Sequence, residues 1–144
     1  ESAMAAYLMM FVSLGAGLPL PFLNLIAAIA YFYFVKKKSP FVHFHALQSL
    51  LSQIPVSILN GVAVVWVFRV LIFDLGFSQT LIGFLITAGG FNFIYIIFSV
   101  IAAVKSYHGR MYYFLFFGKM AYVHAFRMQE EREPVVVENQ APTL

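Results

Sequence analysis

Residues 39–68 read SPFVHFHALQSLLSQIPVSILNGVAVVWVF, a run of 30 residues without an Asp, Glu, Lys or Arg. A helix crosses the hydrocarbon core of a bilayer with about 20 apolar residues, so this run is long enough to span it. Two further runs lack the same four residue types: 34 residues between Glu1 and Lys36, and 30 residues over positions 75–104. The three runs predict at least three membrane-spanning segments.

The amino-acid composition agrees with a chain that is embedded in a lipid bilayer. Hydrophobic residues make up 62% of the chain and charged residues only 10%, whereas a soluble domain carries about 25% charged residues. Backbone groups inside a bilayer must bond to one another, so helices or a closed barrel are the available structures. Strands of a barrel would alternate apolar and polar residues, and these runs are apolar on all sides. We therefore expect an all-α integral membrane protein.

The first apolar run is interrupted by GAGLPLP at residues 15–21. One interpretation is a single long span with a kink, and the other is a hairpin of two short helices over 3–18 and 22–35. We favour the hairpin, because two prolines and two glycines in seven residues are more than a kink requires. Two long spans over 43–73 and 80–104 would complete a four-helix bundle.

The C-terminal part differs in character from the three apolar runs. Residues 111–126 are rich in aromatic side chains but also contain Lys119 and His124, a composition typical of a helix that lies along the membrane surface. We expect residues 1–127 to form a single transmembrane domain. Residues 128–144 are polar and contain prolines, so we expect a disordered tail.

Basic residues gather at one side of the expected bundle. The turn over 74–79 has no basic residue, whereas the other connections carry Lys36, Lys37, Lys38, Lys105 and Arg110. Loops rich in Lys and Arg stay on the cytoplasmic side, so we expect these loops and the C-terminus in the cytoplasm, or in the stroma of a plastid. The same five side chains are candidates for contact with anionic lipid.

Polar residues inside the expected spans are the candidates for a functional role. They are His45, Gln48, Ser49, Ser52 and Asn60 on one span, and Thr87, Asn92, Tyr95 and Ser99 on the next. Many of the spacings are three or four residues, which keeps side chains near one helix face. We favour helix–helix packing through small and hydrogen-bonding side chains. A polar path for a translocated substrate is the alternative.

Catalysis finds little support in the residue inventory. The chain has no cysteine and no acidic residue inside any apolar run, which removes a thiolate nucleophile and the carboxylate of a proton relay. His45 and His108 form a conceivable haem pair, although histidines at the membrane boundary are the favoured interpretation. We expect no enzymatic activity, no cofactor and no metal site. The basic pI of about 9.3 is explained by membrane topology rather than by nucleic-acid binding.

The stretch over residues 18–58 resembles a family of small bacterial membrane proteins. Residues 39–50, SPFVHFHALQSL, match a pattern of the form Ser-x-Phe-Val-x-Phe-(His/Asn)-Ala-x-(Gln/Glu)-(Ala/Ser)-Leu. These proteins are similar to the chloroplast inner-envelope translocon (TIC) component of about twenty kilodaltons, and any role carried over from it is by analogy. The ending IFSVIAAVKSYHGRMYYF (97–114) resembles the bacterial members. The resemblance implies four helices, the bacterial inner membrane or plastid inner envelope, and a part in preprotein import.

The sequence thus favours a non-enzymatic subunit that packs with other membrane proteins, in a protein-import, translocation or assembly complex. One alternative is an accessory subunit of a respiratory or other membrane complex that contacts lipid, quinone or haem. Another is a small passive channel or transporter. The expected partners are other integral membrane subunits and phospholipid, in a homo- or hetero-oligomer.

Overall fold

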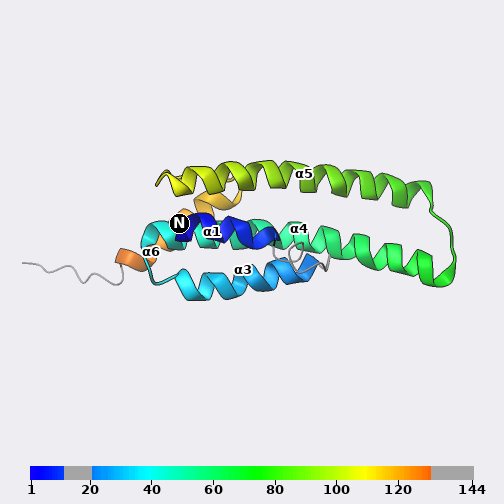
Figure 1. Ribbon diagram of the computed structural model, residues 1–144, viewed down its shortest axis with the longest axis horizontal. Helices are drawn as coiled ribbons and strands as arrows, with labels where there is room; N and C mark the ends of the chain where they lie inside the picture. Colours follow the sequence, from blue (N-terminus) through cyan, green and yellow to red (C-terminus); the bar gives the residue numbers. More distant parts are fainter. Residues whose placement is uncertain (12–20, 131–144) are drawn as a thin grey trace, which may run out of the picture.

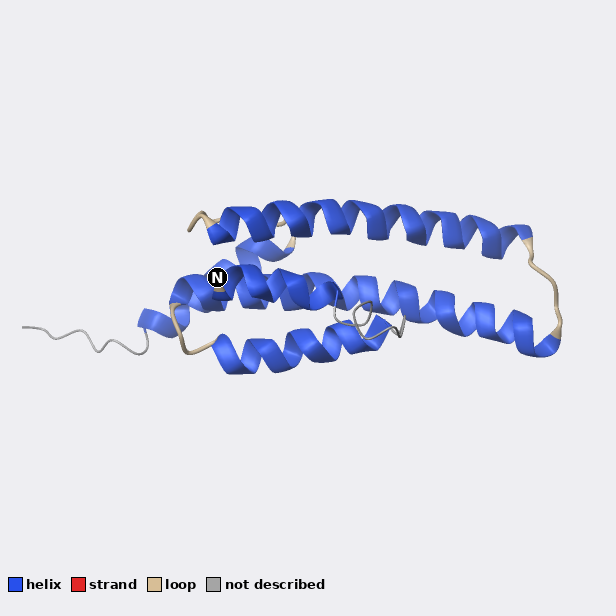
Figure 2. Ribbon diagram, viewed as in Figure 1, coloured by secondary structure: helices blue, strands red, loops and turns tan. Residues whose placement is uncertain are grey.

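The computed structural model describes residues 1–11 and 21–130, and the elements in these ranges are helices joined by short loops (Figures 1 and 2). They comprise five α-helices and one 3₁₀ turn: α1 (Ser2–Leu8), η1 (Met9–Phe11), α3 (Pro21–Val35), α4 (Pro40–Phe73), α5 (Gln79–Tyr107) and α6 (Phe117–Glu130). The prediction of an all-α protein is confirmed.

Helices α4 and α5 form a long antiparallel hairpin that sets the length of the molecule (Figure 1). The Ser39 hydroxyl accepts a hydrogen bond from the Val42 amide at 3.2 Å, and Pro40 occupies the first turn. Serine at the cap and proline just inside are a strong helix start, so α4 begins before the expected residue 43. Ser78 caps α5 in the same way, accepting from the Leu81 amide at 3.2 Å.

The remaining helices lie along α4 from its start to about Gly61, which α3 reaches through Phe22, and do not cover its last turns (Figure 1). Helix α1 packs against α4 and α5, α3 lies along α4, and α6 covers α4 from another side. The Tyr31 hydroxyl donates to the Ser2 carbonyl at 2.7 Å, and the Lys38 ammonium donates to the Ser2 hydroxyl at 3.1 Å. The start of α1 therefore lies beside the end of α3, and the two helices run in opposite directions.

Several expected boundaries differ from the structure. The α-helix expected over 3–18 ends at Leu8 and continues as a 3₁₀ turn to Phe11, while residues 12–20, with most of GAGLPLP, lie outside the described residues. The expected surface helix over 111–126 is wrong at its start, because residues 111–116 are not helical and α6 begins at Phe117. Residues 128–130, expected in the tail, belong to α6. The rest of the tail, 131–144, lies outside the described residues.

Small residues allow the helices to approach closely where they meet. Ala102 and Ala103 of α5 pack on Tyr7 and Phe114, and Ala121 and Ala125 of α6 pack on Phe44. Alanine leaves room for a large partner ring, as at helix contacts in membrane proteins. The buried interior is therefore concentrated at the end of the molecule where five helices gather.

The other half of the α4–α5 hairpin is apolar and faces outward. Leu71, Ile72 and Phe73 are 62%, 71% and 65% exposed. Both helices are long and apolar enough to cross a membrane, yet only 22% and 11% of the residues in their most apolar stretches are buried. Exposed apolar surface of this extent marks contact with lipid or with another protein.

Candidate functional site

The amide of Gln48 joins three separate parts of the fold. Its Nε2 donates to the Tyr7 hydroxyl at 2.8 Å and to the Tyr112 carbonyl at 2.9 Å. Its Oε1 accepts from the Phe114 backbone amide at 3.2 Å. The side chain is fully buried, where an unpaired amide would be costly. Gln48 thus fixes α1 and the segment 111–116 against α4.

His45 extends this contact by one helical turn. Its Nδ1 lies 2.9 Å from the Tyr7 hydroxyl oxygen, and because that hydroxyl already accepts from Gln48, its own proton is available to His45. The imidazole is fully buried and packs edge-on against the rings of Phe41 and Phe44, with centroids 4.5 and 4.8 Å away. His45 is therefore enclosed by rings at the contact between α1 and α4.

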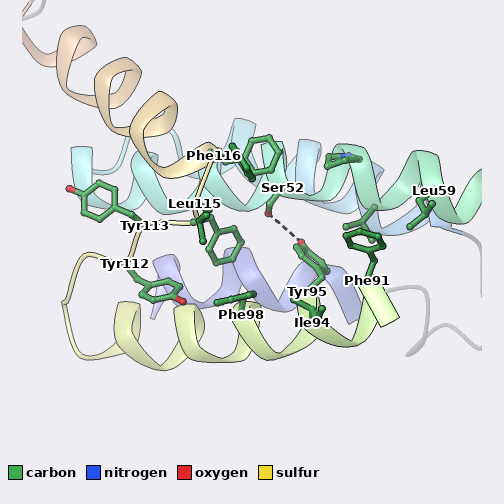
Figure 3. Close-up of a pocket in the computed structure, with 14 residues that line it drawn as sticks. Ser52, Leu59, Phe91, Ile94, Tyr95, Phe98, Tyr112, Tyr113, Leu115 and Phe116 are labelled. Atoms are coloured by element: carbon green, nitrogen blue, oxygen red, sulfur yellow. Dashed lines mark hydrogen bonds between the residues drawn. The ribbon is translucent and has the colours of Figure 1, made fainter. Parts of the chain in front are cut away.

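The serines on the same face of α4 continue the polar network. The Ser49 hydroxyl donates to the Ala6 carbonyl of α1 at 2.8 Å, and Gln53 Nε2 donates to Ser49 Oγ at 3.3 Å. The Ser52 hydroxyl donates to the Ser49 carbonyl at 2.9 Å and lies 3.4 Å from the Tyr95 hydroxyl of α5 (Figure 3). The face of α4 that begins at His45 therefore reaches both α1 and α5.

Asn60 and Asn92 form a second, separate polar contact between α4 and α5. Asn60 Nδ2 donates to Asn92 Oδ1 at 2.8 Å, and Asn92 Nδ2 donates back to Asn60 Oδ1 at 2.7 Å. Asn92 Nδ2 also donates to the Ala88 carbonyl at 2.7 Å. A reciprocal pair of this kind satisfies both amides without water and fixes the register of the two helices.

The sequence-predicted residues on α5 do not all join these contacts. Ser99 is buried one turn from Tyr95. Thr87 is exposed, and its hydroxyl donates to the Gly83 carbonyl of its own helix at 2.8 Å. The Thr87 hydroxyl is therefore satisfied within α5.

An apolar cavity of about 560 Å³ lies beside the polar network, between α4, α5 and residues 112–117 (Figure 3). Its wall includes Leu59, Phe91, Ile94, Phe98, Leu115 and Phe116. The side-chain hydroxyls at the wall include those of Ser52 and Tyr95, which face one another. A cavity of this size and character suits a largely apolar ligand.

Gly118 allows the segment that closes this cavity to lie close to α4. A Cβ at this position would come within 2.7 Å of Tyr113 Cβ, 2.8 Å of Tyr113 Cα and 3.0 Å of Gln48 Oε1. The Gly118 amide donates to the Phe114 carbonyl at 2.9 Å. Only glycine fits this approach without displacing backbone.

Sequence reasoning missed three members of the site: Tyr7, Tyr112 and Gly118. Tyr7 was detectable in principle as a tyrosine hydroxyl near the start of a long apolar run. Tyr112 contributes through its carbonyl, for which no side-chain signal exists. Gly118 stands between aromatic and basic residues and was noted only as part of that segment.

The basic residues predicted to mark one membrane boundary lie at the end of the molecule that carries the N-terminus (Figure 1). The Lys36 ammonium lies 4.2 Å from the centre of the Tyr33 ring, and that of Lys105 lies 4.7 Å from the Tyr112 ring. Lys37 and Arg110 are exposed. Such lysine–aromatic contacts are typical of a membrane boundary.

The environments of the His45 and His108 rings do not favour the haem pair that was the less favoured interpretation of these two residues. His45 is enclosed, as described above, whereas His108 is exposed and its Nδ1 lies 2.8 Å from the Val104 carbonyl. Among residues 1–11 and 21–130, no group of three His, Asp or Glu side chains is placed to hold a metal ion.

Residues 1–121 match the magnetosome magnetite crystal formation protein family, MamF/MmsF. The chain belongs to this family. No curated protein and no solved structure matches the chain. The matched residues include α1, α3, α4 and α5, together with Gln48 and its partners. Membership in this family and the two helices of sufficient length support a location in a membrane.

The MamF/MmsF match overturns the resemblance to the chloroplast translocon component, and with it the predicted role in protein import. The structure explains why the pattern over residues 39–50 indicated the wrong family. Ser39 caps α4, while His45 and Gln48 are buried against α1. These are requirements of helix packing, which do not specify a partner or a transported substrate.

Proposed function

We propose that this chain is a non-enzymatic, multi-pass subunit of the magnetosome membrane that influences magnetite crystal formation by packing with other subunits there. The match of residues 1–121 to the magnetosome family carries this proposal. The buried network around Gln48 supports a packing role, because its polar groups bond to one another and to backbone. The exposed apolar half of the α4–α5 hairpin supplies surface for lipid and for partner subunits.

The proposed arrangement is a four-helix membrane bundle of α1, α3, α4 and α5, with α6 along one boundary. The basic residues at the N-terminal end of the molecule favour a cytoplasmic position for that end. The loop over 74–78 then faces the interior of the compartment where the crystal grows. Its exposed side chains include Asp74, Leu75 and Phe77.

The proposal is tested by complementation in a magnetite-forming bacterium whose own family member has been deleted. We expect the tagged chain to fractionate with magnetosome membranes and to restore crystal dimensions measured by electron microscopy. Gln48→Leu should restore them less well, because it removes the contact between α4, α1 and residues 111–116. Gln79→Leu, at an exposed position, serves as the matched control. A chain that is present in these membranes and leaves crystal size and shape unchanged would refute the proposal.

A further inference from the structure

The cavity beside Ser52 and Tyr95 has an apolar wall. It is open to the surface at Leu115 and Phe116. Leu115 and Phe116 line it and are 85% and 80% exposed. Water in such a cavity would find few hydrogen-bond partners, because the Ser52 and Tyr95 hydroxyls already face each other at 3.4 Å. An apolar chain is the better occupant.

A second hollow adjoins the first on the outer side of α6. It is lined by Lys119, His124 and Arg127 together with Phe116, and Phe116 also lines the apolar cavity. The two hollows therefore share one lining side chain, Phe116. Lys119 and Arg127 are exposed and eight residues apart, which is about 12 Å along a helix. The second hollow thus offers two permanent positive charges beside an apolar cavity.

The direction of α6 relates these hollows to the membrane boundary. Gly118, near its start, lies against Gln48, whereas Ala125 packs with Phe44, nearer the start of α4. Helix α6 therefore runs toward the end of the molecule that carries Lys36, Lys37 and Lys38. The charged hollow lies on the boundary side, and the cavity reaches along α4 as far as Leu59, away from that boundary.

We propose that the two hollows form one binding site for a phospholipid with an anionic headgroup. An acyl chain occupies the cavity between α4, α5 and residues 112–117, and the phosphate lies against Lys119 and Arg127. The apolar wall matches the chain, and the cations match the net negative charge of the headgroup. This site rests on the membrane location proposed above, but not on any role in crystal formation.

The test compares phosphatidylglycerol and phosphatidylcholine with identical acyl chains, added to the purified full-length chain in detergent. We expect phosphatidylglycerol to remain bound in native mass spectrometry and to raise the thermal unfolding temperature more than phosphatidylcholine. The double variant Lys119→Gln/Arg127→Gln should weaken phosphatidylglycerol binding on the order of tenfold. Lys37→Gln/Arg110→Gln removes the same charge at the same end of the molecule but outside the two hollows, and should weaken phosphatidylglycerol binding much less than Lys119→Gln/Arg127→Gln. Equal binding of the two lipids, or an equal loss in both double variants, would overturn the site.

Photocrosslinking locates the acyl chain independently of any substitution in the site. Phosphatidylglycerol with a diazirine in its acyl chain should label peptides containing residues 52–59, 91–98 and 112–117. Labelling confined to the exposed stretch over 62–77 would overturn the proposal. Because these measurements use purified protein, they can succeed even when complementation of crystal formation fails, and the two proposals fail separately.

Discussion

At the scale of single residues, Gln48 connects three parts of the fold: α1, α4 and residues 111–116. Gln48→Leu keeps the size of the side chain but removes its bonds to Tyr7 and Tyr112 and leaves the Phe114 amide without its acceptor. Losing net contributions of about 1 kcal/mol per bond and leaving a buried amide unpaired should lower the free energy of unfolding by about 2–4 kcal/mol. Unfolding of purified protein in detergent, followed by circular dichroism, measures this loss.

Gln53 provides a matched control on the same helix. It is also buried, but its bond to Ser49 is long at 3.3 Å, and its Oε1 has no hydrogen-bond partner in the described part of the chain. Gln53→Leu should change the stability by less than about 1 kcal/mol, since it removes a poorly satisfied amide. Equal losses in the two variants would mean that the specific bonds of Gln48 do not hold the segments together.

On α4, the sequence identified several side chains that the structure buries, but it did not identify the groups that they contact. Spacing placed His45, Ser49 and Ser52 near one face of α4 with Gln48 beside it, and the structure buries all four. Their partners lie 38 to 66 residues away for His45 and Gln48, and some of them are backbone groups. Helical periodicity carries no information about such distant backbone atoms, so the joining of α1 to residues 111–116 through one amide was not predictable.

At the scale of elements, the start of α6 depends on the absence of a side chain at Gly118. Gly118→Ala would press a Cβ into the backbone of Tyr113 at 2.8 Å, so α6 or the segment before it must shift. We expect a loss of stability of about 1–3 kcal/mol, as for other overpacked positions. The same detergent unfolding measurement applies. Weaker protection of residues 111–116 in hydrogen exchange would show that the segment has moved.

Gly90→Ala is the control for the general effect of replacing a helical glycine by alanine. Nothing lies within 4 Å of a Cβ at Gly90, in the interior of α5, so alanine should stabilise the helix by up to about 1 kcal/mol. If both variants stabilise the protein, the close approach at Gly118 is not a constraint.

The elements differ in how well their limits follow from the sequence. For α4 and α5, the long apolar runs gave limits within three residues of those observed, and the Ser caps that set the helix starts were not used in the prediction. Residues 111–116 have an aromatic composition compatible with a surface helix. They are not helical, because the Tyr112 carbonyl and the Phe114 amide form hydrogen bonds with Gln48 instead. Local composition fails where a distant side chain supplies the backbone hydrogen bonds.

At the scale of the whole molecule, α4 has 34 residues and is about 51 Å long at 1.5 Å per residue. In the proposed membrane arrangement, a hydrocarbon core of about 30 Å cannot contain it upright, so α4 would tilt or extend into the headgroup region. The basic end, with α6 alongside, is suited to that region because Lys36 and Lys105 lie over aromatic rings there. In the same proposal, the loop between α4 and α5 lies beyond the opposite face of the bilayer.

This arrangement predicts which positions a membrane-impermeant thiol reagent reaches from each side. The chain has no cysteine, so Lys37→Cys, Leu75→Cys and Arg110→Cys each introduce a single thiol at an exposed position. When the chain is expressed in the inner membrane of a bacterium that forms no magnetosomes, the reagent added to intact cells should label Leu75→Cys alone, since that loop then lies across the membrane from the cytoplasm. In inverted vesicles it should label Lys37→Cys and Arg110→Cys. If Leu75→Cys reacts from the same side as the other two, α4 and α5 do not cross the bilayer, and the membrane arrangement proposed for this protein is wrong.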